Sequence, residues 1–418
     1  MVKVSSLKKY ARKSVTVLKN EGAVSLGIKG LKKLRKKQIQ HTNNPALKRK
    51  FTSLVDRVNV MEANWSEQPY DANVAKKAIK PPYTINWVMS PPSGGGGHQN
   101  MFRFISLLDK MGHKNNIYLY STFDDMTIAQ AKDNVASYSS AKNLTFSRFD
   151  AKNMAKADIL FATGWETAYP VFNVKTDARK MYFIQDFEPY FYPMGTDYIL
   201  AENTYKFGFH GITAGGWLSS KLSSEYGMVC DHYDFGANKD LYKVLNTEKR
   251  KEIFFYARPV TERRGFDLGI MALEIFHKAM PEYTINLAGW DVSEWDVPFP
   301  YVNHTALQIS ELPELYNKSA AALVLSLTNM SLLPLELLAC GTIPVVNDAP
   351  NNRLVSDNPF ITYTDSSPQA LANALIATVK RADLPAYAEK AAVSVAADGW
   401  EVAGERFLGV LDRELSRG

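Results

Sequence analysis

Three arginines in the second half of the chain have positions that suit the binding of a diphosphate. Arg258 directly follows an apolar run at 253–257, and Arg263 and Arg264 come shortly after it. At the end of a buried strand, fixed guanidinium charges can neutralise the negative charge of a departing diphosphate. Arg263 and Arg264 are adjacent, so we expect one of them to point inward, and Arg258 and Arg263 are the candidate catalytic cations. The alternative is that these residues are exposed in a turn.

A glutamate further along the chain is a candidate ligand for sugar hydroxyls. Residues 332–346 indicate a helix start near Pro334, one apolar turn, a stop at Gly341 and then a buried strand. At the helix N-terminus the carboxylate of Glu336 can accept two hydroxyls of a ribose or hexose, while backbone N–H groups there can hold phosphate. Leu333 is expected to line the same site. The alternative is that Glu336 only complements the helix dipole.

Four consecutive glycines in the first half of the chain indicate a ligand-facing loop. Gly94 to Gly97 follow an apolar run at 84–89 and precede a helical pattern, so their N–H groups can approach a phosphate or sugar closely. The loop is not a dinucleotide fingerprint, because Gln99 or Asn100 stands where the third glycine should be, and it lacks the lysine of a P-loop. The alternative is a flexible surface turn. The expected ligand contacts are Gly95, Gly96 and Gly97.

Carboxylate and amide side chains follow two other strands of the same half. The segment 182–189 delivers Gln185, Asp186 and Glu188 to the end of a strand, and Glu166 ends another. Asp186 is the candidate catalytic residue, because its carboxylate can orient or deprotonate an acceptor hydroxyl, and all four side chains are candidates for acceptor binding. No second carboxylate cluster or histidine pair accompanies them, so we expect no metal and no cofactor. Solvent-exposed loop positions are the alternative for Glu166.

The elements that position these residues form two successive β/α runs of similar size. They predict an α/β fold with two doubly wound, Rossmann-like domains and a cleft between them, in which ligands bind beyond the carboxyl ends of the strands. Strands are expected at 84–89, 116–120, 158–162, 181–184, 211–213, 253–257, 283–288, 322–326 and 343–346, and helices at 101–112, 266–280 and 401–417.

The chain divides by pattern into an extension, two domains and a last helix. We expect a basic extension and connector at 1–80, an acceptor domain at 81–245, a donor domain at 246–400 and a helix at 401–418 that crosses back to the first domain. At 418 residues and 46% hydrophobic content the chain can build two full cores. Its apolar runs are far shorter than the ~18 residues of a membrane span. No apolar signal segment follows the basic N-terminus, and two cysteines in apolar contexts indicate a cytoplasmic protein.

Positive charge is concentrated at the N-terminus. The first 50 residues contain 15 Lys and Arg and one acid, Glu21, whereas the whole chain has 49 basic and 43 acidic residues. Val24, Ile28, Leu31 and Leu34 recur at helical spacing among lysines, which indicates a basic amphipathic helix. Such a helix can lie on an anionic membrane surface. It can also pack on its own domain, whereas nucleic-acid binding is disfavoured because the remaining chain is acidic and has no recognition motif.

The motifs of the second half resemble a known enzyme family. The segments 258–265, 333–341 and 344–346 are similar to the C-terminal signature of retaining GT-B glycosyltransferases of family four, and the glycine loop after the first strand is typical of the same fold. The segments 182–189, 213–218 and 235–238 look like the rhamnosyltransferase branch, which includes β-1,2-rhamnosyltransferases of bacterial S-layer glycan assembly. The resemblance covers residues 80–418.

The resemblance also assigns roles to individual residues. It implies that Glu336 binds ribose hydroxyls and that Arg258 with Arg263 or Arg264 contacts the diphosphate. The family's other glutamate, which contacts the donor sugar, maps to Thr328, so that carboxylate is absent. This loss fits a donor with different hydroxyl geometry, such as a deoxysugar.

The sequence therefore predicts a metal-independent glycosyltransferase at the cytoplasmic face of the plasma membrane. The expected donor is a nucleotide-diphospho sugar, dTDP-β-L-rhamnose above others, and the expected acceptor is a growing, lipid-linked polysaccharide. The peripheral membrane contact would come from the basic N-terminus. Alternatives are a UDP- or GDP-sugar donor, an epimerase or phosphorylase on the same scaffold, and a non-catalytic carbohydrate-binding assembly protein.

Overall fold

The computed structural model describes residues 54–71, 78–123, 126–396 and 399–417. The basic helix expected within the first 50 residues lies outside these ranges. By their contacts the described residues form two compact units. The first contains the chain up to Thr213, then Lys221–Asp231 and the residues from Phe407 on, and the second contains Ala214–Ser220 and His232–Arg406. None of the described helices is long and apolar enough to cross a membrane.

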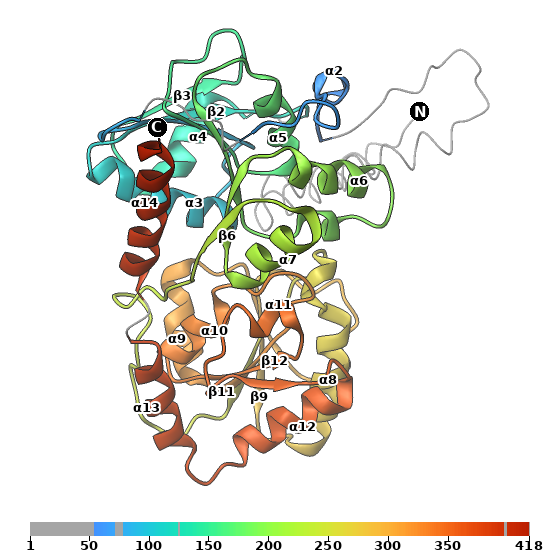
Figure 1. Cartoon of the computed structure of the whole chain (residues 1–418). Coiled ribbons are helices and arrows are strands. Elements are labelled where there is room, and N and C mark those ends of the chain that lie inside the picture. The colour runs from blue at the N-terminus through green and yellow to red at the C-terminus, as the bar shows by residue number, and fades with distance from the viewer. Residues whose placement is uncertain (1–53, 72–77, 124–125, 397–398, 418) are drawn as a thin grey trace, which may run out of the picture. The chain divides into compact units, whose positions relative to one another are not determined.

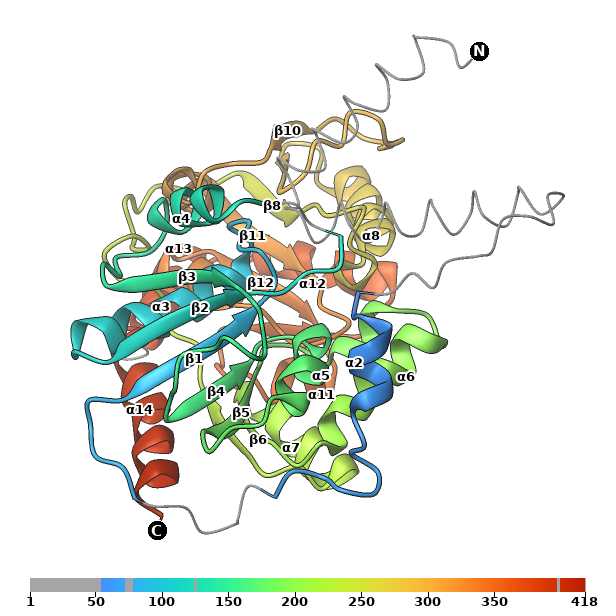
Figure 2. The same cartoon turned by 90° about the horizontal axis from the view of Figure 1, so that it is seen from above.

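The first unit is built on a seven-stranded sheet with the order β3-β2-β1-β4-β5-β6-β7. The strands from β3 to β6 pair in parallel and follow one another in this order in Figure 2. Trp87 of β1 stacks on Phe161 of β4 with ring centroids 4.3 Å apart, so large apolar side chains fill the centre of the sheet. The strands are β1 (Thr84–Met89), β2 (Lys114–Leu119), β3 (Leu144–Arg148), β4 (Ile159–Ala162), β5 (Arg179–Ile184), β6 (His210–Ala214) and β7 (Cys230–Tyr233).

Helices cover both faces of this sheet, as a buried parallel sheet requires. In Figure 1, α3 and α14 lie on one face and α5 lies on the other. Phe407 of α14 packs against Phe104 of α3, with ring centroids 4.8 Å apart, and also faces Trp87. The helices are α2 (Arg57–Glu62), α3 (Gly96–Lys110), α4 (Ile128–Ala136), α5 (Trp165–Asn173), α6 (Thr196–Asn203), α7 (Gly216–Tyr226) and α14 (Trp400–Ser416), with the 3-10 turns η1 (Glu188–Phe191) and η2 (Thr204–Lys206).

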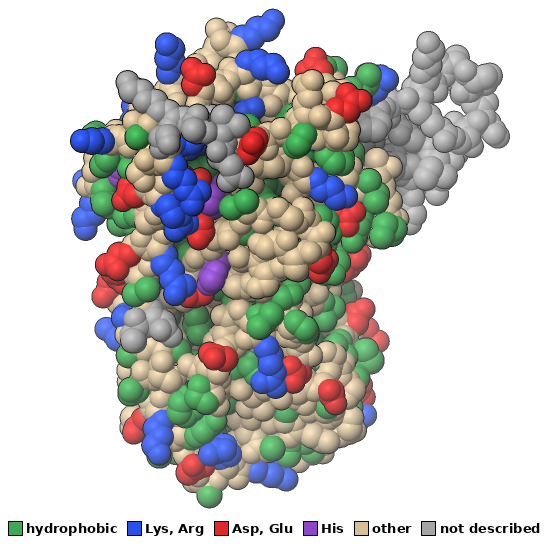
Figure 3. Space-filling model, in the orientation of Figure 1, with side chains coloured by type: hydrophobic (Ala, Val, Ile, Leu, Met, Phe, Trp, Pro, Cys, Tyr) green, Lys and Arg blue, Asp and Glu red, His purple; other side chains and the backbone are tan. Residues whose placement is uncertain are grey.

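Charged groups hold the end of α14 on the first unit. His210 lies between two carboxylates, with Nε2 2.8 Å from Asp231 and Nδ1 3.3 Å from Glu414. Arg413 pairs with the same Asp231, and Arg417 lies 2.7 Å from Glu414. In Figure 3, Lys and Arg side chains accordingly alternate with Asp and Glu side chains over α14. The part of α14 from Phe407 on is therefore fixed to the first unit by both apolar packing and ion pairs.

The second unit is built on a six-stranded parallel sheet with the order β10-β9-β8-β11-β12-β13. Helices α8 and α12 cover one face, and α9, α10 and α13 cover the other (Figure 1). The strands are β8 (Glu252–Tyr256), β9 (Thr284–Ala288), β10 (Val302–Thr305), β11 (Ser319–Val324), β12 (Ile343–Asn347) and β13 (Thr362–Thr364). The helices are α8 (Phe266–Ala279), α9 (Leu312–Lys318), α10 (Leu333–Ala339), α11 (Pro350–Arg353), α12 (Pro368–Val379) and α13 (Leu384–Ser394), with the 3-10 turns η3 (Glu262–Arg264) and η4 (Ile309–Glu311).

The predicted fold class is confirmed, because both sheets are parallel, Rossmann-like and covered by helices. The strand expected at 84–89 has those bounds in β1. The strand expected at 322–326 lies earlier in the chain, at Ser319–Val324, because the apolar run continues through Leu325 into the loop. The edge strands β3, β7, β10 and β13 were not predicted, since each is short and carries polar, partly exposed side chains.

Candidate active site

Both sheets have the same topological switch point, where a doubly wound fold binds its ligand. In the first sheet β1 lies between β2 and β4, and in the second β8 lies between β9 and β11. At a switch point, consecutive connections run to opposite sides of the sheet, so the loops that follow two adjacent strands diverge. In the first sheet these are the loops after β1 and β4, and in the second those after β8 and β11. Each pair of loops opens a crevice beyond the strand ends. All the residues predicted to bind ligand follow a strand or belong to a helix at these carboxyl ends.

Arg258 follows β8 in the second unit and is held by aromatic rings. Its Nη1 donates to the carbonyl of Gly289 at 3.1 Å, and its guanidinium carbon lies 5.8 Å from the ring centroids of both Tyr256 and Trp290. The rings attract the cation and restrict its side chain without neutralising its charge. Arg258 is half-buried at the end of β8, where its charge can meet an anion.

The neighbouring arginines connect the loop after β8 to the loop after β11. Arg264 donates from Nη1 to Oγ of Ser326 at 2.9 Å, and the carbonyl of Arg263 accepts from the N–H of Leu327 at 2.9 Å. Between η3 and α8 the backbone turns at Gly265, whose φ of 57° suits a residue without Cβ. The two loops at the switch point are thus fixed to each other.

Buried amide side chains support the loop after β11, and they are not among the residues predicted from the sequence. The carbonyl of Ser326 accepts from Asn347 at 3.0 Å, from Asn351 at 3.0 Å and from Asn352 at 3.2 Å. Asn352 also donates to the carbonyl of Asn347 at 2.7 Å, and none of these amides is more than 9% exposed. Satisfied amides in a dry core fix a single loop geometry. The signal in the sequence was the group of asparagines that follows β12.

Thr328 lies within this loop, and Glu336 lies in the helix α10 that follows it. Thr328 is 2% exposed and accepts a hydrogen bond at its carbonyl from Asn351. Glu336 lies in the first turn of α10, which ends in a paired C-cap: the N–H of Gly341 donates to Leu338 at 2.7 Å and that of Thr342 to Leu337 at 2.9 Å. The predicted stop at Gly341 is confirmed by its φ of 73°.

The side chain of Glu336 is partly exposed and lies near the buried Tyr316. Glu336 itself is half-buried, whereas Leu333 is 8% exposed. Burial, and then the charge of Glu336, raise the pKa of Tyr316 well above its usual range. The carboxylate therefore lies close enough to influence this phenol while it remains open to solvent on another side. It can accept hydroxyl groups from a ligand.

The glycine loop of the first unit opens α3. Gly94 has a φ of 83°, Gly95 is the N-cap residue and no side chain caps the helix. A Cβ atom built on Gly95 or Gly96 would meet nothing within 4 Å, whereas one on Gly97 would lie 3.3 Å from Gln185. Gln185 donates to the carbonyl of Gly97 at 3.0 Å, so it binds the loop rather than pointing away from it. The N–H groups of the helix start are thus open to an anion.

Glu188 is buried and connects two loops of the first unit. Its Oε2 accepts from the N–H of Trp165 at 2.7 Å and from the hydroxyl of Tyr182 at 2.6 Å, and its own N–H donates to the Tyr205 hydroxyl at 3.0 Å. Burial, and then the nearby charge of Glu166, raise the pKa of Glu188 to about 8. Glu188 therefore fixes the loops after β4 and β5 and is only 9% exposed.

Glu166 and Asp186 are more accessible than Glu188. Both are half-buried at the ends of β4 and β5. The carboxylate of Glu166 turns back over Gly164, where a Cβ atom would lie 2.7 Å from Oε2, and burial raises its pKa. Asp186 accepts from the N–H of Phe187 at 2.8 Å through Oδ1. Of the predicted carboxylates, these two can present an oxygen to a ligand of the first unit.

A neutral histidine lies beside the glycine loop, and no metal cluster accompanies these carboxylates in the described part of the chain. His98, just after the glycines, has its Nε2 3.3 Å from the hydroxyl and 3.2 Å from the carbonyl of Ser90. Burial lowers its pKa to about 4, so the imidazole is neutral at physiological pH. Across the residues that the structure describes, no group of three His, Cys, Asp or Glu side chains gathers as metal ligands do.

The two halves of the chain match two domains of one protein family. Residues 103–214 match the N-terminal domain of WsaF, and residues 251–376 match its C-terminal domain. The chain belongs to the WsaF family. Both matches lie on the Rossmann-like units described above, and the second includes every arginine of the site as well as Thr328 and Glu336.

A curated relative and two solved structures extend this result. The O-antigen biosynthesis protein RfbC of Myxococcus xanthus is 30% identical over 267 residues, which are 62% of this chain but 21% of that protein. A glycosyltransferase from Rickettsia africae has a TM-score of 0.61 at 14% identity, and the match covers 80% of this chain and 99% of that chain. Anabaena HepE, solved in complex with UDP, has a TM-score of 0.62 at 12% identity, and the match covers 79% of this chain and 100% of that chain. These structures share the GT-B fold with the WsaF-family chain.

Proposed function

We propose that this WsaF-family chain transfers rhamnose from dTDP-β-L-rhamnose to a growing, lipid-linked cell-surface polysaccharide with retention of configuration. The observation that carries the proposal is the second switch point, where Arg258, Arg264 and Glu336 follow β8 and β11 on loops fixed by buried amides. Cations and a hydroxyl-accepting carboxylate are the groups that a nucleotide-diphospho sugar needs. The relation to RfbC, named for O-antigen biosynthesis, supports a polysaccharide acceptor.

The second unit binds the donor in this proposal. Glu336 accepts the ribose hydroxyls, and Arg258 with Arg263 or Arg264 neutralises the diphosphate as it departs. HepE, which has the same fold, was solved with UDP and with UDP-glucose, so this scaffold can hold a nucleotide sugar. Thr328 takes the place of the family's first glutamate, and its lack of a carboxylate favours a deoxysugar such as rhamnose.

The first unit binds the acceptor. Asp186 orients the acceptor hydroxyl, and Glu166 offers a second oxygen beside it. In a retaining transfer of this kind the departing phosphate takes the acceptor proton, so Asp186 need not act as the base. Gln185 and Glu188 act on the loops: the first holds the glycine loop and the second joins the segments that carry Glu166 and Asp186. The open N–H groups of Gly95 and Gly96 are assigned to phosphate binding.

We place the reaction at the cytoplasmic face of the plasma membrane, where a lipid-linked acceptor would be available. The basic N-terminus supports this placement by its composition, because 15 Lys and Arg within the first 50 residues can attract anionic lipids. A vesicle sedimentation assay with and without phosphatidylglycerol tests this part alone. Equal binding to neutral and anionic vesicles would refute it.

Product analysis tests the reaction itself. The protein is incubated with dTDP-β-L-rhamnose alone and together with membranes that contain the lipid-linked acceptor. We expect rhamnose in the polymer only when acceptor is present, and a β-linkage by the one-bond C–H coupling of the anomeric carbon. A changed sugar without acceptor indicates an epimerase, and incorporation from UDP- or GDP-sugars but not from dTDP-rhamnose indicates another donor. Binding of carbohydrate without turnover of any donor indicates a non-catalytic assembly protein.

A further inference from the structure

A cavity lies in the second unit, at the opposite end of the sheet from the candidate active site. Its volume is about 440 Å³, within the range of small-molecule sites. Among its lining residues, Arg250 precedes β8, Tyr283 precedes β9, Ala320 lies at the start of β11 and Gly341 precedes β12. The cavity therefore opens at the amino ends of the strands, whereas the arginines and Glu336 lie at the carboxyl ends or in α10. It is a separate pocket.

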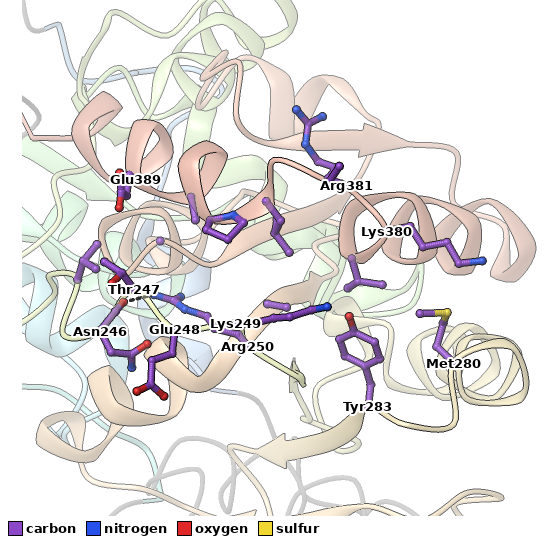
Figure 4. Close-up of a pocket in the computed structure, with 18 of the residues that line it drawn as sticks. Asn246, Thr247, Glu248, Lys249, Arg250, Met280, Tyr283, Lys380, Arg381 and Glu389 are labelled. Atoms are coloured by element: carbon purple, nitrogen blue, oxygen red, sulfur yellow. Dashed lines mark hydrogen bonds between the residues drawn. The ribbon is translucent and has the colours of Figure 1, made fainter.

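Arg250 is a half-buried cation in this pocket that faces only weak, neutral partners. It donates to the carbonyls of Asn246 and Ser319, to Oδ1 of Asn317 and to the hydroxyl of Thr342, all at 3.3–3.4 Å. These distances are longer than the 2.7–2.9 Å of a guanidinium with an oxyanion. Among the described residues no carboxylate forms a salt bridge with Arg250. Figure 4 shows its contact with Asn246 as a dashed line.

The other walls of the pocket are mostly apolar. Met280, Tyr283 and Val379 are each 7% exposed, and Leu384 and Ala388 of α13 complete this side. An apolar body of a few carbons can displace water from these walls, and this burial of apolar surface favours binding. A ligand that fits the pocket therefore combines an apolar part with a group that Arg250 can bind.

The remaining charges of the pocket lie on its rim. Glu248, Glu282 and Glu389 are exposed, as are Lys249 and Lys380, so solvent screens them. A sixth rim residue, Arg381, lies 3.0 Å from Asp383 and is directed away from Arg250 in Figure 4. Burial makes Arg250 different, because its charge lies in a region of lower dielectric and interacts more strongly with an incoming anion.

We propose that this pocket is a second ligand site, which takes a small molecule with an oxyanion group on an apolar body and binds that oxyanion through Arg250. The oxyanion is a phosphate ester or a carboxylate, since a guanidinium binds either by two parallel hydrogen bonds. The site reaches the C-terminal end of α10: a Cβ on Gly341 would lie 3.3 Å from Nη2 of Arg250 and 3.4 Å from the carbonyl of Ala388. The ligand would thus touch the end of the helix that carries Glu336.

Binding of simple probes to the full chain tests this site without any assay of activity. Thermal shift and calorimetry are carried out with phenyl phosphate, benzoate, inorganic phosphate and benzyl alcohol, each with dTDP in excess to occupy the proposed nucleotide site. We expect phenyl phosphate or benzoate to stabilise the protein, inorganic phosphate to bind more weakly because it lacks the apolar body, and benzyl alcohol to bind negligibly. Which of the two aryl anions binds more tightly distinguishes a phosphate ester from a carboxylate.

Variants locate the binding. Arg250→Gln removes the cation, and Ala388→Phe fills the apolar side while Arg250 remains, so a folding defect in one variant leaves the other informative. Lys251→Gln is the matched control, because Lys251 is an exposed neighbour that does not line the pocket. We expect at least tenfold weaker binding in the first two variants. The control should bind as tightly as the wild type. The proposal is overturned if neither aryl anion binds the wild type at about 10 mM, or if either pocket variant binds as tightly as the wild type. Failure of dTDP to bind would count against the proposed function and leave this result unaffected.

Discussion

The two switch points of the molecule have the same strand order but loops of different charge. After β8 and β11 the second unit presents Arg258 and Arg264, and a core of buried amides holds these loops. After β4 and β5 the first unit presents Glu166 and Asp186, and a buried carboxyl group holds these loops. In the proposed function, one Rossmann-like frame thus binds the departing diphosphate with arginines in one unit and orients the acceptor hydroxyl with carboxylates in the other. The difference lies in the loops, as it does in many proteins that share this frame.

The strongest test of this comparison removes the charge of Arg258 in the second unit. Arg258→Ala is expected to lower the rate of rhamnose transfer by ~10²–10³, because a departing diphosphate would lose a fixed charge. Arg258→Lys should retain part of the activity, since it keeps the charge but not the planar fork. Turnover is measured with labelled dTDP-rhamnose, and Lys278→Ala on the exposed side of α8 is the control. A rate for Arg258→Ala within threefold of the wild type would exclude the arginine from catalysis.

The amide core of the second unit should matter for stability more than any surface residue. Asn352 is fully buried and donates to the carbonyls of Ser326 and Asn347. Asn352→Ala removes both buried hydrogen bonds, although Asn347 and Asn351 still donate to Ser326, and is expected to lower the free energy of unfolding by ~2–3 kcal/mol. Asn373→Ala removes an amide that is exposed on α12, so we expect a change within ~0.5 kcal/mol. Urea unfolding measures both, and equal midpoints for the two variants would argue against a structural role of the amide core.

The carboxylate of α10 should affect nucleotide binding, whereas those of the first unit should not. Glu336→Ala is expected to weaken dTDP binding by ~1–3 kcal/mol, because charged hydrogen bonds to the ribose are lost. Glu166→Gln, in the first unit, is expected to leave dTDP affinity unchanged, and so is Glu405→Ala on an exposed position of α14. Calorimetry gives the affinities. A larger loss in Glu166→Gln than in Glu336→Ala would reverse the assignment of the two units.

Glu188 should make the stability of the first unit depend on pH. Its pKa is raised to about 8 by burial and by Glu166, so the folded state binds a proton that the unfolded chain releases near the usual value of ~4.3. Between these two pKa values the folded state binds more protons, and stability therefore falls as pH rises through this window. We expect the wild type to lose ~1–3 kcal/mol more than Glu188→Gln between pH 5 and about 8.5. Parallel pH profiles of the two proteins would show that the buried carboxyl group does not titrate in this window.

The sequence was sufficient for the central strands and for the helix that carries Glu336, but not for the contacts that hold the loops. The apolar run of β1 and the Gly341 stop of α10 are local patterns, and both appear in the structure as predicted. The burial of Glu188 depends on Tyr182 and Trp165, which neighbouring strands bring to it. Asn351 and Asn352, which follow β12, likewise donate to Ser326 in the loop after the neighbouring strand β11. Local patterns do not contain such contacts, so a buried and an exposed carboxylate look alike in the sequence.

Donor binding is the most direct test of the central claim that the second unit holds a nucleotide-diphospho sugar. A thermal-shift panel compares dTDP-rhamnose, UDP-glucose and GDP-mannose on the wild type and on Glu336→Ala. At 100 times its dissociation constant a ligand stabilises the folded protein by ~2.7 kcal/mol. We expect this shift with dTDP-rhamnose on the wild type, smaller shifts with the other two donors, and a reduced shift on the variant. No shift with any of the three donors, or the same shift in both proteins, would contradict the account.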